Sequence, residues 1–306
     1  MAQPAAAVAP QRFTSGLVLA VAGAIAFSGK AIIVKLAYRH SVDAVTLIML
    51  RMLFALPLFL VMAWWASRGK PPLTRRDWAG VVGLGVTGYY LASFLDFAGL
   101  AYISASLERL ILYLTPTLVL ALGWMLYRKR ITRLQLVGVA VSYGGTLLVF
   151  GQELTMQADG RTAWGALLVF ASAVSYAVYL VYSSQLVQRL GSLRLVGLAT
   201  SVACLCCIAQ YLALRPVGLA LTLPAEVMWL SVLNATACTA APVLMVMMAV
   251  ERIGAGLASQ VGMVGPLSTI VMGIFILGEP FTAWIAAGTV LVVGGIYLFT
   301  RGARQA

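Results

Sequence analysis

The sequence predicts an all-α integral membrane protein with ten transmembrane helices, arranged as two inverted five-helix repeats. Three observations lead to this prediction. Of the 306 residues, 62% are apolar and only 10% are charged, whereas soluble domains are about 25% charged. Apolar runs of the length needed to cross a bilayer recur along the whole chain. Finally, the second half repeats a pattern of the first. This composition excludes a soluble enzyme and a secreted disulfide-rich protein.

Ten apolar runs are bounded by charged residues, glycine or proline, and each is expected to form one spanning helix. The first five are Gly16–Tyr38, Val45–Ser67, Trp78–Leu100, Ala105–Leu126 and Leu134–Phe150. The second five are Trp164–Leu186, Leu195–Leu214, Ala225–Met248, Ala255–Leu277 and Thr282–Thr300. The chain is thus expected to divide into a cytoplasmic tail (1–15), a first repeat (16–150), an external linker (151–163), a second repeat (164–300) and a cytoplasmic tail (301–306).

The distribution of Lys and Arg predicts the orientation. If the N-terminus is cytoplasmic, the inside segments hold 14 of the 21 basic residues, and the outside segments hold only Arg39, Arg161 and Arg215. Because basic residues gather on the cytoplasmic side, both termini are expected there. We expect the chain in the bacterial inner (plasma) membrane. The net charge of +12 reflects this topology rather than nucleic-acid binding, since no basic face is present.

An internal repeat is visible when residues 101–150 are aligned without a gap on residues 251–300, because ten of the 50 positions are identical. The identical pairs include Pro116 with Pro266, Thr132 with Thr282, Gly138 with Gly288 and Gly145 with Gly295. Since each half holds five spans, an odd number, the second copy must cross the membrane in the opposite sense. Inverted repeats are typical of transporters that alternate access around a midplane site.

Two stretches of the chain resemble a known family. Ser104-Ala-Ser…Leu-Thr-Pro116 and Gly265-Pro266…Leu277-Gly-Glu-Pro-Phe-Thr282…Gly288…Gly294-Gly295 resemble the two halves of EamA-type drug/metabolite transporters. Within that family the chain looks most like the YddG-type bacterial exporters of aromatic and other neutral amino acids. The resemblance implies a secondary transporter with a central cavity walled by spans 3, 4, 8 and 9. A drug or other metabolite exporter or importer of the same fold, or a facilitative channel, is the alternative.

Candidate substrate contacts lie in spans 3, 4, 8 and 9, which would form most of the cavity wall, and in span 6. The YddG-type exporters carry aromatic residues before the span-4 proline and in span 6, where this chain has Tyr113, Thr115 and Tyr176; Thr115 departs from the aromatic pattern. Met263 occupies the position equivalent to Tyr113 in the second repeat. The full candidate set is Tyr89, Tyr90, Tyr113, Thr115, Tyr176, Asn234, Gln260 and Met263. Packing between helices is the alternative role for these side chains.

Two further groups of residues are candidates for the transport mechanism. Pro116 and Pro266 are expected to bend their helices and take part in gating, or else to be packing kinks retained from a duplication. Ionisable groups inside spans are costly and usually functional. Those proposed to form an intramembrane charge network are Lys30, Arg51, Asp96, Glu108 and Arg109. They either form ion pairs that fix helix packing, or supply a cation for a substrate carboxylate and a carboxylate for proton coupling.

The sequence offers no catalytic motif. His40 is the sole histidine and lies near a loop; there is no HExxH metal motif and no Walker lysine loop. Cys204, Cys206, Cys207 and Cys238 lie in apolar segments and are expected to be buried thiols. We therefore expect no enzymatic activity, no cofactor and no bound metal. The expected partners are a small-molecule substrate and the lipid bilayer, with no nucleic acid, and the chain is expected to be a monomer.

Overall fold

The structure, a computed structural model, describes residues 10–112, 114–127, 132–156, 161–246, 248–249, 252 and 264–303. Within these residues all regular secondary structure is helical and no strand occurs. A helix satisfies its backbone hydrogen bonds internally, which is the condition for crossing a bilayer. The prediction of an all-α protein is confirmed for this part of the chain.

In the first half of the chain the helices are α1 (Pro10–Tyr38), α2 (Ala44–Ser67), α3 (Arg75–Leu84), α4 (Ala92–Leu100), α5 (Ala105–Leu112), α6 (Thr115–Tyr127) and α7 (Arg133–Met156). In the second half they include α8 (Arg161–Leu190), α9 (Ser192–Leu214), α10 (Ala225–Ala235), α12 (Val264–Met272) and α13 (Ala283–Ala303). The described residues also form three π-helical segments, η1 (Gly85–Leu91), η3 (Thr236–Ala240) and η4 (Gly273–Leu277), and one 3-10 helix, η2 (Val217–Thr222).

Local sequence signals explain several helix boundaries. Asp43 caps α2, and its Oδ1 accepts a hydrogen bond from the backbone N–H of Thr46 at 3.2 Å. Thr74 and Asp77 form a reciprocal capping box at the start of α3. Gly278 ends η4 with a φ of 72°, a conformation that glycine adopts without steric cost. These caps place the helix ends close to the predicted span boundaries.

Seven stretches of the described chain are long and apolar enough to cross a membrane. They are Thr14–Tyr38, Ala44–Ser67, Arg75–Leu100, Arg133–Gln152, Arg161–Ser183, Ser192–Leu214 and Ala225–Val246. Two shorter apolar helices are Ser268–Leu277 and Ala283–Gly295. The expected fourth span is built differently, as two helices, α5 and α6, so neither half reaches spanning length by itself. The expected ninth span, from residue 255, lies partly outside the described residues.

The helices extend beyond several predicted span ends. α7 continues to Met156 and α8 begins at Arg161, so both reach into the segment 151–163 that was expected to be a linker. Residues 152–156 hold no proline or glycine, and Gln, Glu, Leu and Met among them favour helix. Likewise α1 already includes Pro10, the first described residue, and α13 continues to Ala303.

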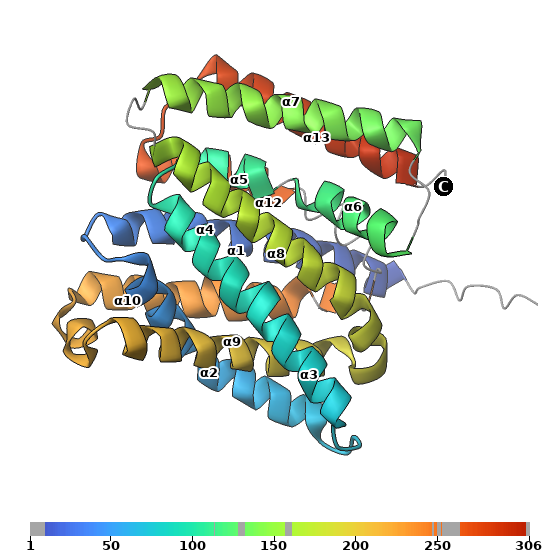
Figure 1. Ribbon diagram of the computed structural model, residues 1–306, viewed down its shortest axis with the longest axis vertical. Helices are drawn as coiled ribbons and strands as arrows, with labels where there is room; N and C mark the ends of the chain where they lie inside the picture. The colour runs from blue at the N-terminus through green and yellow to red at the C-terminus, as the bar shows by residue number, and fades with distance from the viewer. Residues whose placement is uncertain are drawn as a thin grey trace, which may run out of the picture.

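The helices α7 and α13 lie side by side along one edge of the molecule (Figure 1). Glycines let the two backbones approach each other. A Cβ atom on Gly145 would lie 2.7 Å from the carbonyl oxygen of Gly288, and one on Gly295 would lie 2.5 Å from that of Gly138. Because the later glycine of each helix meets the earlier glycine of the other, the pair is antiparallel.

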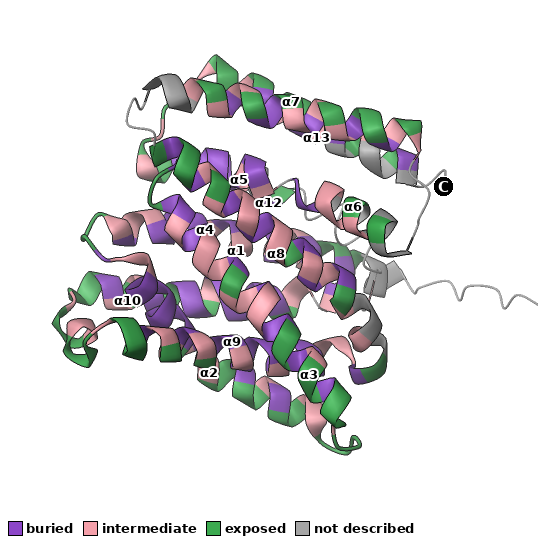
Figure 2. Cartoon of the chain, viewed as in Figure 1, coloured by how far each residue is buried: buried purple, intermediate pink, exposed green. Residues whose placement is uncertain are grey.

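The described helices enclose three apolar cores, one larger and two smaller. The larger core includes residues of α1, α2, α4, α9 and α10, among them the fully buried Phe59 and Phe97. One smaller core lies among α5, α7, α8, α12 and α13, and the other among α3, α8 and α9. Burial follows the inward faces of the helices, and exposed residues follow their outward faces (Figure 2). Large apolar side chains such as Trp65, Trp229 and Phe275 are exposed, as expected where lipid rather than water covers the surface.

Candidate functional site

Four charged side chains from three helices meet inside the bundle. Lys30 on α1 forms an ion pair with Asp96 on α4, and its Nζ lies 3.7 Å from Oε1 of Glu108 on α5. On the other side, Nε of Arg109 lies 3.1 Å from Oε2 of Glu108. Asp96 is 2% exposed and Glu108 is fully buried. The structure thus brings together four of the five residues predicted for the charge network, and each carboxylate has a nearby cation.

The fifth member, Arg51, reaches the cluster through an aromatic ring. Its guanidinium carbon lies 4.6 Å from the ring centroid of Phe97, and Lys30 Nζ lies 5.9 Å from the same centroid. Phe97 directly follows Asp96 on α4, and its carbonyl accepts a hydrogen bond from the Tyr38 hydroxyl at 2.5 Å. A ring face attracts cations, so Phe97 holds two positive groups on one buried side chain.

A second cluster consists of tyrosines at the crossing of η1 and α8. The rings of Tyr89 and Tyr179 meet edge to face at 5.2 Å with their hydroxyl oxygens 3.2 Å apart. The rings of Tyr176 and Tyr179 stack at 5.5 Å. Gly88 makes the crossing possible, because a Cβ there would lie 2.3 Å from the Tyr179 ring. With Tyr176 38% exposed, the cluster offers an aromatic surface carrying hydroxyl groups.

The other described candidates lie elsewhere. Tyr90 follows Tyr89 on η1 but packs against the larger core, whereas Tyr89 packs with Tyr179. Asn234 at the end of α10 is fully buried, and neither its Oδ1 nor its Nδ2 has a hydrogen-bond partner in the described structure. Thr115 begins α6 and donates a hydrogen bond to the Leu112 carbonyl at 2.7 Å, so its hydroxyl has a local structural role.

Pro116 lies in the first turn of α6, as its second residue, where the missing N–H is tolerated because early N–H groups have no helical acceptor. Pro266 lies in α12, close to the edge of the described residues. The chain turns just before α6, with Leu114 N–H donating to the Ile111 carbonyl at 3.0 Å. Tyr113, Gln260 and Met263 lie outside the described residues.

Glu279 positions the charge cluster, a role that its place in the sequence did not predict. Its Oε1 accepts a hydrogen bond from the backbone N–H of Ala105 at 2.9 Å, and its Oε2 accepts one from the Ser106 hydroxyl at 2.8 Å. An anion at a helix N-terminus is favourable, so Glu279 holds the start of α5, the helix that carries Glu108 and Arg109. In the sequence, Glu279 is visible only as an acidic residue directly after the glycine that ends a helix. This position does not predict its partners, Ser106 and Ala105, which are 173 and 174 positions away along the chain.

Two π-helical segments flank these clusters. η1 carries Tyr89 and Tyr90, and η3 carries Cys238 directly after α10 and Asn234. Such segments occur frequently at functional sites, because the extra residue per turn redirects side chains. Among the residues that the structure describes, no group of three His, Cys, Asp or Glu side chains is placed to hold a metal ion. The arrangement can bind and orient a polar or aromatic small molecule.

Comparisons with known proteins identify the family of this chain and several similar transporters. The sequence model of the EamA-like transporter family matches residues 14–151 and again residues 163–301. The uncharacterized transporter YcbK of Bacillus subtilis (strain 168) is 28% identical over 298 residues, which cover 94% of this chain and 92% of that protein. An uncharacterized transporter of Archaeoglobus fulgidus is 24% identical over 282 residues, covering 91% and 95%. A protein of known crystal structure shares the fold with a TM-score of 0.65 at 19% identity, covering 95% and 98%.

Proposed function

Because the chain belongs to the EamA-like transporter family, we propose that it is a secondary transporter that exports small neutral metabolites by alternating access. Aromatic and other neutral amino acids are the proposed cargo. The likeness to YddG-type exporters supports this cargo, as does the aromatic surface of Tyr89, Tyr176 and Tyr179. The protein would act as a monomer in the bacterial inner membrane, without enzymatic activity.

The observation that carries the proposal is a set of contacts that recurs when residue numbers shift by 150. The approach of Gly145 to Gly288 on α7 and α13 is matched by that of Gly295 to Gly138, the equivalent pair with the repeats exchanged. Contacts that map onto themselves in this way are produced by a two-fold axis between equivalent units. They support two inverted repeats, near 16–150 and 164–300, and the family match to both halves supports the same division.

Whole helices follow the same exchange. α1 packs on α10 and η3, while α8, at the equivalent place in the second repeat, packs on α3 and η1. In the same way α2 packs on α10 and η3, and α9 packs on α3 and η1. The π-helical segments also correspond, since Gly85–Leu91 shifted by 150 covers residues 235–241, which contain Thr236–Ala240. This correspondence supports ten spans, with α5 and α6 together forming the fourth.

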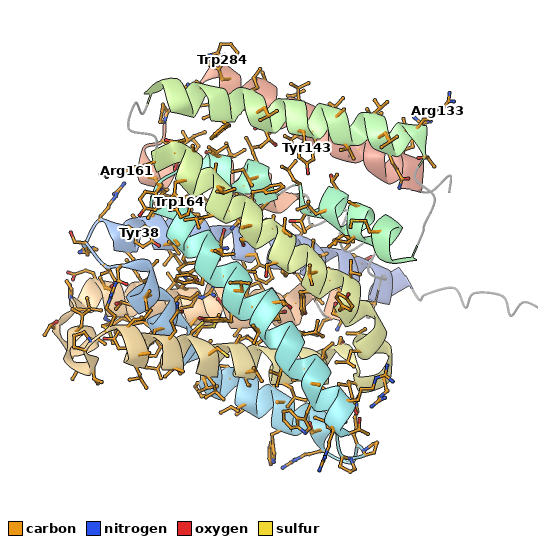
Figure 3. The ribbon with its side chains drawn as sticks, in the orientation of Figure 1. Tyr38, Arg133, Tyr143, Arg161, Trp164 and Trp284 are labelled. Atoms are coloured by element: carbon orange, nitrogen blue, oxygen red, sulfur yellow. The ribbon has the colours of Figure 1, made fainter. Side chains whose placement is uncertain are left out.

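The ends of the molecule support the proposed orientation. Arg161, expected outside, lies at one end of the bundle together with Tyr38 and Trp284, which were expected at the outer ends of their spans (Figure 3). Arg133, expected inside, lies at the other end (Figure 3). Labelling of single cysteines in a variant without the four native cysteines tests this orientation. Arg161→Cys should react with a membrane-impermeant maleimide on intact cells, and Arg133→Cys only after permeabilisation. The reverse pattern would invert the proposed topology.

Flux into proteoliposomes tests the function. Purified protein would be reconstituted and loaded with unlabelled amino acid, and the entry of radiolabelled phenylalanine, leucine and alanine would be followed with and without a pH gradient. Saturable entry that depends on the internal amino acid is the expected result for alternating access. Non-saturating flux would indicate a channel, and saturable flux confined to other metabolites would correct the cargo. Protein-free liposomes are the control.

A further inference from the structure

The charges of the intramembrane cluster do not balance. Lys30, Arg51 and Arg109 are cations, and Asp96 and Glu108 are the carboxylates that lie among them. With all five groups ionised, the cluster carries one excess positive charge. An uncompensated charge inside a membrane protein is costly, and such charges commonly mark substrate or ion pathways.

Arg51 is the cation that lacks a carboxylate partner. Lys30 contacts both carboxylates, and Arg109 contacts Glu108 and donates a hydrogen bond to the Phe27 carbonyl at 3.3 Å. Arg51 is only 4% exposed, and its Nε is buried without a hydrogen-bond partner. Within the described residues, no Asp or Glu lies within ion-pair distance of its guanidinium. The face of Phe97 and the more distant carboxylate of Asp96 compensate the guanidinium charge in part, and a ring face replaces an anion incompletely.

Three cysteine thiols surround Arg51. The thiols of Cys204 and Cys207 on α9 and of Cys238 on η3 lie within the electrostatic reach of its guanidinium, and the Cys204 sulfur also lies 3.6 Å from the Met52 sulfur. Lys30 and Arg109 lie within electrostatic reach of Cys238 as well. Asn234, one helical turn before Cys238, is fully buried with both amide atoms unpaired. The bundle thus holds a guanidinium and an amide whose hydrogen-bonding capacity is not used within the described residues.

We infer that the Arg51 guanidinium binds the carboxylate of the transported molecule. The inference rests on the proposed transport function and names the chemical group that the site recognises. A guanidinium donates two parallel hydrogen bonds to a carboxylate, and this pairing is stronger than one between neutral groups. The single excess positive charge of the cluster equals the charge of a monoanionic group in magnitude. A phosphate dianion would require two excess positive charges. Neutral amino acids, which are zwitterions, present this group.

Matched substrates test the inference on the wild-type protein. In the proteoliposome assay, each carboxylate compound is paired with an analogue that lacks only this group: alanine with ethylamine, leucine with isoamylamine, and phenylalanine with phenethylamine. We expect saturable transport of at least one carboxylate compound, and a KM at least about tenfold higher for its amine. Equal KM values within a pair would overturn the inference while leaving the transporter function intact. Absence of saturable flux for every carboxylate compound would overturn the inference together with the proposed amino-acid cargo.

Substitution of Arg51 tests the residue itself. Arg51→Met should raise the KM of the transported carboxylate compound at least about tenfold, and Arg51→Lys, which keeps the charge but loses the paired donors, should raise it less. The matched control is Arg68→Met at the end of α2, because the Arg68 guanidinium also covers an aromatic ring, Trp64, at 3.5 Å. Elution as a single species in detergent verifies folding. An unchanged KM in folded Arg51→Met protein, or an equal rise in Arg68→Met, would overturn the assignment.

Discussion

Thr132 precedes α7 and contacts the end of α13. Thr282, which is 150 positions further along the chain, precedes α13 and contacts α7 near its end. The Thr132 hydroxyl accepts from the Gln135 backbone at the start of α7 and lies 3.4 Å from the Gly302 carbonyl at the end of α13. The Thr282 hydroxyl accepts from the Ile285 backbone at the start of α13 and lies 2.9 Å from Oε1 of Gln152 near the end of α7. Since 152 and 302 also differ by 150, the two contacts are equivalent.

The same relation continues along the pair, because Ser142 Oγ lies 3.4 Å from the Val292 carbonyl and these two positions are equivalent to each other. The antiparallel pair α7–α13 is therefore joined symmetrically at both ends and near its middle. A symmetric interface of this kind offers the same close contacts twice, so substitutions at equivalent positions should have equal effects.

The glycines of this pair provide the first test. Gly145→Ala and Gly295→Ala should each lower the free energy of unfolding by about 2 kcal/mol, because the added methyl group would overlap a backbone carbonyl of the facing helix. Thermal unfolding in detergent measures the effect. The neighbouring Gly144 and Gly294 are matched controls with nothing within 4 Å of an added Cβ. Alanine there should be neutral or slightly stabilising, since alanine favours helix.

Unequal losses at the two equivalent glycines would contradict the symmetric interface. So would losses at Gly144→Ala that match those at Gly145→Ala, because the effect would then come from helix flexibility and not from contact between α7 and α13.

The sequence predicted most of the helices because apolar runs and their boundaries are local properties. Asp43 and Thr74, which cap α2 and α3, lie just before helices that the apolar pattern had placed. The repeat was also readable, since glycine and proline at equal spacing require similar backbone geometry. The interruption before Pro116 was expected only as a bend, because a proline does not by itself reveal whether a helix kinks or starts again.

Contacts between helices could not be predicted in the same way. Phe97 gave no sign that it would lie under Arg51, since a cation–π contact depends on the packing of α4 against α2. The partners of Glu279 lie in the other half of the chain. Tyr89 and Tyr90 were treated alike as candidates, but successive residues of a helix point in different directions, so they reach separate clusters.

Lowering the pH should weaken the ion pair between Asp43, in the loop between α1 and α2, and Arg215, at the end of α9. Burial alone would raise the pKa of the Asp43 carboxyl, but hydrogen bonds from Thr46 and the Arg215 guanidinium outweigh this effect and lower the pKa below its ordinary value. A lowered folded-state pKa stabilises the protein above the unfolded-state pKa, near 3.8, and this contribution is lost as pH falls through the folded-state value.

Unfolding of wild type and Asp43→Ala protein as a function of pH checks this expectation. The substitution should cost about 1 kcal/mol at pH 7, the usual value of a helix cap, and the two proteins should converge in stability as pH falls below 3.8. A constant difference across the pH range would show that the Asp43 carboxylate charge is not responsible.

Glu108 should be needed for folding stability because it lies between two cations. Glu108→Gln would leave Lys30 and Arg109 with one carboxylate fewer, and removal of one partner from a buried ion pair costs about 3 kcal/mol. The control is Glu226→Gln at the exposed start of α10, where the change should be within about 0.5 kcal/mol. Thermal unfolding of both variants in the same detergent separates them, and equal effects would refute a special role for Glu108.

The tyrosine cluster should set the preference for aromatic cargo. Tyr176 stacks on Tyr179 and is partly exposed, so its ring can stack on an aromatic side chain, an interaction of about 0.5–1.5 kcal/mol. Tyr176→Ala should therefore raise the KM for phenylalanine about three- to tenfold and change that for alanine little. Tyr176→Phe, which keeps the ring, should retain the wild-type value. Tyr182→Ala, on the same helix and 49% exposed, serves as control. Equal KM changes for phenylalanine and alanine in Tyr176→Ala would mean that the ring supports the helix crossing and does not contact the cargo.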